Sequence, residues 1–230
     1  MGYTYSTYVT ALSSALEVDP ADTDFIAQLP QIIDTAEQIC YRELDLLASI
    51  VTVTSALTAN SRFFTLPTSG GTIHFLVVDA INVFDAANTR HSLTPATRKG
   101  IDFMWPSETA LTTAWMPNVF ARISDTQLLV GGSPGAAWNC EVIGTIRPAP
   151  LSVSNTSTYL GNYLSDLFFC ASMVAAVGTL LKNYGAQADS SGQAMSWEAQ
   201  YQQRLASAKR EELRKSFVSA MSSPPTSAKA

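Results

Sequence analysis

The spacing of hydrophobic positions changes twice along the chain. In the first 48 residues, apolar positions recur three or four apart, at Val9, Leu12, Leu16, Ile33, Ala36, Cys40, Leu44 and Leu47. This spacing predicts amphipathic helices, with a break at Asp19-Pro20 because a residue before proline avoids the α region. Thr23 or Asp24 is the expected cap of the second helix.

From residue 49 to residue 150 the period shortens to two. β-branched and aromatic residues alternate with polar ones, and Gly, Pro and Asn separate the runs. The pattern predicts strands at Ile50–Thr54, Arg62–Leu66, Ile73–Phe84, Val119–Ser124, Gln127–Val130 and Trp138–Ile146. Asp125-Thr126 is the expected tip of a tight hairpin, and 97–104 is expected to contain one or two helical turns. We therefore expect an antiparallel sheet inserted between helical segments.

Helical spacing returns after residue 150. Residues 159–184 form one apolar stretch, without charge between Asp166 and Lys182. The fifteen uncharged residues span roughly 22 Å as a helix, short of the ~30 Å core of a bilayer. A buried central helix is therefore favoured over a membrane anchor.

A second long helix is expected from about Ala194 to Ser219. Its apolar stripe consists of Trp197, Tyr201, Leu205, Ala208 and Phe217, and Lys209 to Lys215 form a charged end. There, Glu211 and Lys215 have the i,i+4 spacing of a helix-supporting ion pair. The fold class is thus predicted as α+β: a helical bundle of two N-terminal and two long C-terminal helices with an inserted antiparallel β region. The expected divisions are 1–48, 49–150, 151–219 and a flexible tail, 220–230.

The composition is poor in charge. Only 14% of residues are charged while 47% are hydrophobic, which indicates that much of the surface faces other protein. The net charge of −5 argues against general electrostatic binding of nucleic acid. The three cysteines lack CxxC spacing, so free thiols in a reducing cytosol are expected.

Residue patterns for catalysis are missing from the sequence. His74 and His91 have no partners at motif spacing, and the glycine-rich segment 131–135 lacks the Lys-Ser/Thr of a phosphate loop. We therefore predict no catalytic, cofactor-binding or metal-binding residues, and no enzymatic activity.

Three phrases, in this order, carry a resemblance: PQIIDTAEQICYRELDLLA, VIGTIRPAPLSVSNTSTYL and NYGAQADSSGQAMSWEAQY. Together with the order of helices and β insert, they resemble the head-to-tail adaptor, or connector, proteins of short-tailed bacteriophages. The resemblance covers about residues 22–218 and contains no catalytic signature.

The resemblance implies a structural virion protein at the head–tail junction, made in the host cytoplasm. Such adaptors form a dodecameric ring under the portal protein, extend the DNA channel without sequence-specific DNA binding, and dock tail or nozzle proteins. By analogy, residues 190–230 would reach the portal and the β insert would face neighbouring subunits or the tail. The implied portal or subunit interface comprises Trp197, Tyr201, Leu205, Lys209, Arg210, Arg214, Phe217, Pro224 and Pro225. For Trp197 and Tyr201, core and interface roles remain equally open.

Three alternatives remain. A tail tube or nozzle component would not stack directly on the portal. A small soluble enzyme or ligand-binding module would be a stable monomer with one concave polar site. A membrane protein would use residues 167–181 as its anchor and would need detergent for extraction.

Overall fold

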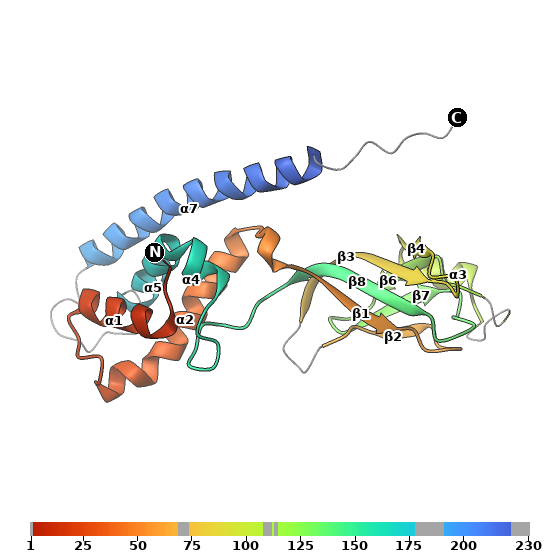
Figure 1. Ribbon diagram of the computed structural model, residues 1–230, viewed down its shortest axis with the longest axis horizontal. Helices are drawn as coiled ribbons and strands as arrows, with labels where there is room; N and C mark the ends of the chain where they lie inside the picture. Colours follow the sequence, from red (N-terminus) through yellow and green to blue (C-terminus); the bar gives the residue numbers. More distant parts are fainter. Residues whose placement is uncertain (1, 69–73, 108–111, 113–114, 178–190, 222–230) are drawn as a thin grey trace. The chain divides into compact units, whose positions relative to one another are not determined.

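A computed structural model describes residues 2–68, 74–107, 112, 115–177 and 191–221 (Figure 1). The chain divides into two compact units. The helical unit comprises Met1–Ala48 with Ala149–Ala230, and the sheet unit comprises Ser49–Pro148. Each unit has its own hydrophobic core.

The helical unit begins with α1 (Tyr5–Leu16) and α2 (Thr23–Glu43). Glu17, in the left-handed conformation, ends α1. Asp22, one residue before the expected caps, begins α2: its side chain accepts hydrogen bonds from the amides of Asp24 and Phe25, at 2.8 and 3.1 Å. These bonds satisfy amides that have no partner within the helix.

Three further described helices complete this unit: α4 (Tyr159–Tyr163), α5 (Ser165–Ala175) and α7 (Ser191–Met221). Leu164, with φ −122° and ψ 38°, leaves the helical conformation and separates α4 from α5. α5 packs against both α2 and α7, which explains why it is apolar on nearly every side (Figure 1). The end of the predicted apolar helix, beyond residue 177, lies outside the described residues.

The sheet unit follows a short 3-10 turn, η1 (Leu47–Ser49). Its first sheet has the strand order β1-β8-β3-β4, and its second has the order β2-β7-β6-β5. Their bounds are β1 Ile50–Ala56, β2 Phe63–Thr65, β3 Phe75–Phe84, β4 Arg90–Ser92, β5 Thr94–Pro95, β6 Val119–Arg122, β7 Gln127–Gly131 and β8 Asn139–Ile146. The expected hairpin at Asp125-Thr126 joins the antiparallel strands β6 and β7.

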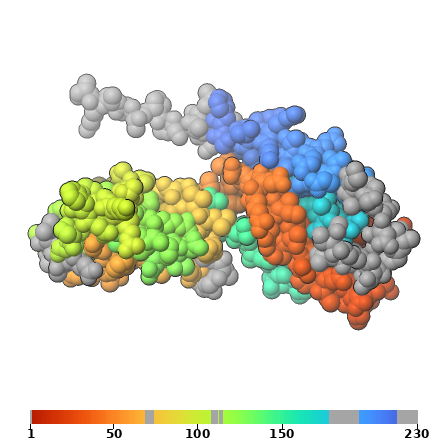
Figure 2. All heavy atoms as spheres, turned by 180° about the vertical axis from the view of Figure 1, so that it is seen from behind, coloured from red at the N-terminus to blue at the C-terminus, as the bar shows by residue number. Residues whose placement is uncertain are grey.

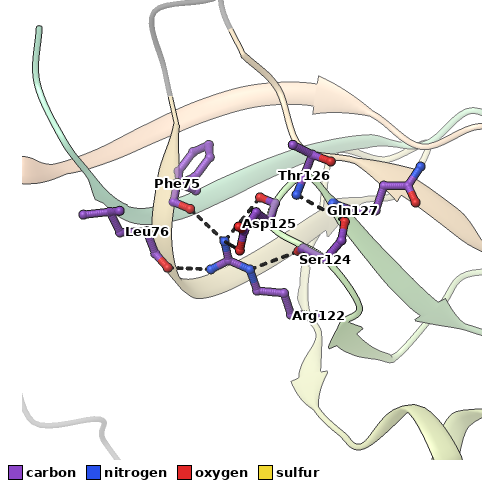
Figure 3. Close-up of polar contacts among 7 residues, drawn as sticks. All are labelled: Phe75, Leu76, Arg122, Ser124, Asp125, Thr126 and Gln127. Carbon is purple, nitrogen blue, oxygen red and sulfur yellow. Dashed lines mark hydrogen bonds and ion pairs between the residues drawn. The ribbon is translucent and has the colours of Figure 1, made fainter.

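The two sheets share one core. Ile81, Val83 and Val142 contribute from the first sheet, and Phe120 and Leu128 from the second. Arg122 of β6 links the sheets at one end, since its guanidinium donates hydrogen bonds to the carbonyls of Phe75 and Leu76 in β3 (Figure 3). The same guanidinium reaches the carbonyls of Ser124 and Asp125 in its own hairpin, each at 3.2 Å.

The predicted fold class was wrong. The structure is not a helical bundle with a small antiparallel insertion, because the β region forms two four-stranded sheets. The second sheet is mixed: β5 and β6 run parallel, and α3 (Arg98–Met104) provides the crossover between them. One of the two long C-terminal helices is also divided, at Leu164, into α4 and α5.

Candidate partner-binding surface

Helix α7 presents two different faces. At about 100° per residue, Trp197, Leu205, Ala208 and Glu212 all lie within about 40° of Tyr201 around the helix axis. This inner face is the buried one: Tyr201 is 2% exposed and Leu205 is 3% exposed. The ring of Trp197 meets that of Phe169 on α5 edge to face, with centroids 6.1 Å apart. The inner face therefore packs within the helical unit.

The opposite side of α7, its outer face, exposes two apolar side chains to solvent. Leu213 and Phe217, one turn apart, are 67% and 65% exposed. Arg210 and Arg214 alternate with them, so these four residues form the outer face of α7. Phe217, predicted as part of the stripe with Tyr201, lies about 160° around the helix from it. Figure 2 shows α7, in blue, as a ridge along the helical unit.

A polar cluster on the inner face holds the C-terminal half of α7 against the rest of the helical unit. The buried carboxylate of Glu212 accepts hydrogen bonds from Lys215, at 2.7 Å, and from the amide of Leu47, at 3.4 Å. Lys215 also donates to the hydroxyl of Tyr159 at 2.8 Å and forms the predicted ion pair with Glu211 at 2.8 Å. Burial lowers the pKa of Lys215, but its hydrogen bonds to Glu211, Glu212 and Tyr159 outweigh that effect and raise its pKa overall.

The basic residues of α7 differ in whether the chain neutralises them. Arg204 pairs with Asp166 at 2.9 Å, and Lys209 lies 3.8 Å from the carboxylate of Glu43. Within the described part of the chain, Arg210 and Arg214 form no ion pair. The outer face thus combines two uncompensated guanidinium groups with two exposed apolar side chains. Arg and aromatic residues are enriched in protein interfaces, and this face contains two arginines and Phe217.

The sequence-predicted interface residues therefore separate into three groups. Tyr201 and Leu205 are buried and Trp197 is half-buried, all within the helical unit, whereas Lys209, Arg210, Arg214 and Phe217 are exposed. Pro224 and Pro225 lie outside the described residues. Sequence reasoning missed Leu213, although its i,i+4 spacing to Phe217 was a usable signal.

The histidine and cysteine side chains, which could take part in catalysis or metal binding, lie outside α7. His91 contacts Asp85 at 3.2 Å, His74 is exposed, and Cys40, Cys140 and Cys170 are buried free thiols. Burial raises the pKa of the Cys40 and Cys140 thiols to about 12, which keeps them protonated and unreactive. In the ranges that the structure describes, no three His, Cys, Asp or Glu side chains gather as metal ligands. No described helix has both the length and the apolar character needed to cross a membrane.

The described residues thus build a surface of the kind that binds another protein. The family model described as SU10 adaptor protein matches residues 3–224, so the chain belongs to the SU10 adaptor protein family of bacteriophage structural proteins. This match confirms the resemblance to phage head-to-tail adaptors. None of the curated proteins compared with the chain matches it. As an adaptor, the protein interacts with other virion proteins.

Proposed function

We propose that this protein is the head-to-tail adaptor that joins the portal to the tail of a short-tailed bacteriophage. In this function, twelve copies form a ring under the portal, continue the DNA channel and offer a docking surface to tail or nozzle proteins. The net charge of −5 supports the channel role, because a basic lumen would hold DNA phosphates instead of letting them slide. The role is structural and requires no cofactor.

The outer face of α7 is the observation that carries this proposal. Its arginines are exposed and uncompensated, and Leu213 and Phe217 are too exposed to contribute to the core of the helical unit. We assign this face to the portal contact. The complementary portal surface is acidic and contains an apolar depression, because buried interface arginines need carboxylate partners. The sheet unit is then available to neighbouring subunits or to the tail.

Electron microscopy of the protein mixed with the portal from the same phage tests the proposal. We expect a second ring stacked on the portal and sharing its rotational symmetry. The variant Arg210→Gln/Arg214→Gln should form few stacked rings and should lose the salt sensitivity of binding. The matched control is Arg98→Gln/Lys99→Gln, at two exposed basic positions of α3 in the sheet unit, with the same change in net charge.

Two outcomes would contradict the proposal. Portal rings beside unbound protein would reject the adaptor role and leave a tail component as the next candidate. Stacked rings formed equally well by both double variants would keep the adaptor role but remove the α7 outer face from the portal contact.

A further inference from the structure

Strand β1 is a long edge strand without the usual protection against pairing. It lies at one edge of the first sheet and runs for seven residues, IVTVTSA, without a charge or a proline. The other edge strands of the two described sheets are β4, β2 and β5, and none exceeds three residues. β4 contains Arg90 and His91, and β5 contains Pro95. Natural sheets protect their edges by such shortness, charge or proline, so β1 is the exception.

The backbone direction of β1 follows from one hydrogen bond. The amide of Leu57, which continues the β1–β8 register by one residue, donates to the carbonyl of Trp138 at 2.8 Å. In an antiparallel ladder, residues alternate between bonding to the neighbouring strand and pointing away from it. Residues 51, 53 and 55 therefore bond to β8, and the backbone groups of Ile50, Thr52, Thr54 and Ala56 point out of the sheet.

The outward groups of β1 are available for pairing. Among the described residues, no hydrogen-bond partner outside the β1–β8 ladder reaches the amides or carbonyls of Ile50, Thr52, Thr54 or Ala56. The side chains of these four residues are exposed. The β1–β8 register also runs without the shifts that interrupt β3–β8, so the edge is regular over its whole length.

The sequence of β1 is complementary to itself in the antiparallel direction. A two-fold axis through Val53 would place Thr52 opposite Thr54 of a second copy, and Ile50 opposite Ala56 of that copy. Even-numbered residues then meet even-numbered residues, so that outward backbone groups face outward backbone groups and each such pair exchanges two hydrogen bonds. Because β1 has no charge, this pairing brings no like charges together.

We propose that the β1 edge binds the β1 edge of a second copy of this chain, forming a two-fold symmetric dimer of the free protein with one continuous sheet. A two-fold contact uses the same surface on both copies and closes at two subunits, so it cannot serve as the repeating contact of a ring. The dimer is thus a form that precedes ring assembly, and the inference goes beyond the proposed adaptor function. It covers an edge that would otherwise promote aggregation.

Charge substitutions at the two threonines test the dimer and its register. Thr52→Lys/Thr54→Lys places lysine opposite lysine twice across the two-fold axis, and should weaken dimerisation by about tenfold or more. Thr52→Glu/Thr54→Lys, the Lys/Glu variant, places glutamate opposite lysine twice and should keep the dimer. The lysine is placed at position 54 because that residue lies opposite Glu141 of β8. The side chains of Thr52 and Thr54 are exposed and do not contribute to the core, so the circular dichroism spectrum should be unchanged in both variants. Sedimentation over a concentration series measures the dissociation constants of the full-length protein.

The results separate the possible occupants of the edge. A wild-type dimer that Lys/Lys breaks and Lys/Glu retains supports the proposal. A monomeric wild-type protein, or a dimer equally sensitive or insensitive to both variants, overturns it. If Lys/Lys blocks stacking on the portal while the free wild-type protein is monomeric, the edge belongs to another virion protein. The portal experiment on wild-type protein does not depend on these outcomes, so failure of the dimer leaves the adaptor function standing.

Discussion

At the scale of single residues, Glu37 is the least expected feature of the helical unit. It lies on α2 with 3% of its surface exposed, and its carboxylate accepts a hydrogen bond from the amide of Leu151 at 3.1 Å. Burial raises its pKa to about 7; the Leu151 bond opposes this effect and the nearby charge of Asp34 adds to it. Glu37 thus fastens the chain where it re-enters the helical unit, at the cost of burying a carboxyl group.

The raised pKa predicts how stability depends on pH. Between about pH 4.5 and 7, the unfolded chain releases the Glu37 proton while the folded chain keeps it, so the free energy of unfolding falls as pH rises. A shift from 4.5 to about 7 corresponds to about 3 kcal/mol, to order of magnitude. Glu37→Gln, which still accepts the Leu151 bond, should remove this loss. Urea unfolding at pH 5 and pH 8 measures it.

Comparing Glu37→Gln with the wild type at the same pH separates the effect of Glu37 from that of the other titrating groups. The variant should be more stable than the wild type at pH 8, and their difference should shrink or reverse at pH 5. A stability difference that is the same at both pH values would show that Glu37 does not carry the raised pKa. Asp45→Asn serves as a control, because Asp45 is an exposed carboxylate that does not contribute to the raised pKa of Glu37.

At the scale of elements, α7 shows what helical spacing establishes and what it leaves open. The four-residue spacing of Trp197, Tyr201 and Leu205 correctly predicts a helix with an apolar face. It does not say whether that face meets the same chain or another, since both kinds of surface are apolar. That distinction depends on α5, which lies beside α7 in the fold but carries no mark of the pairing in its sequence.

For the strands too, the local sequence pattern identifies the elements but not which of them pair. Alternating residues indicated β1, β2, β3, β6, β7 and β8, but β4 and β5 are too short and too polar to be recognised. Which strands pair is a long-range property, so the local pattern could not predict that the β region divides into two sheets. The break at Leu164 was missed because no proline marks it; the nearest signal is Thr158, which caps the short α4.

Leucine-to-alanine substitutions on the two faces of α7 should change the free energy of unfolding by very different amounts. Leu205→Ala removes a buried side chain and should lower the free energy of unfolding by about 2–5 kcal/mol. Leu213→Ala removes a side chain that is 67% exposed and should change the free energy by no more than about 0.5 kcal/mol. Denaturant unfolding of the two variants measures both values. Equal losses would mean that Leu213 is covered within the chain and that the outer face of α7 is not a free surface.

At the scale of the whole molecule, the chain has two cores built from different parts of its sequence. The core of the helical unit draws on residues before 48 and after 149, and the core of the sheet unit draws on the continuous segment between them. The sheet unit is therefore an insertion in the sequence of the helical unit, and folding of the helical unit requires contacts between distant parts of the sequence. The contact of α5 with α2 is one of these.

Separate cores predict separate unfolding transitions, each sensitive to substitutions in its own unit. Leu205→Ala should shift only the transition of the helical unit. Arg122→Met removes the donors that hold the carbonyls of Phe75 and Leu76, and should lower only the stability of the sheet unit, by about 1–3 kcal/mol. Arg98→Met is the matched control, because the ion pair of Arg98 with Asp102, 3.7 Å long and largely exposed, should contribute little. Calorimetry of the single variants and of Leu205→Ala/Arg122→Met should show two independent, additive shifts. A single transition that both substitutions lower would mean that the two cores unfold as one cooperative unit.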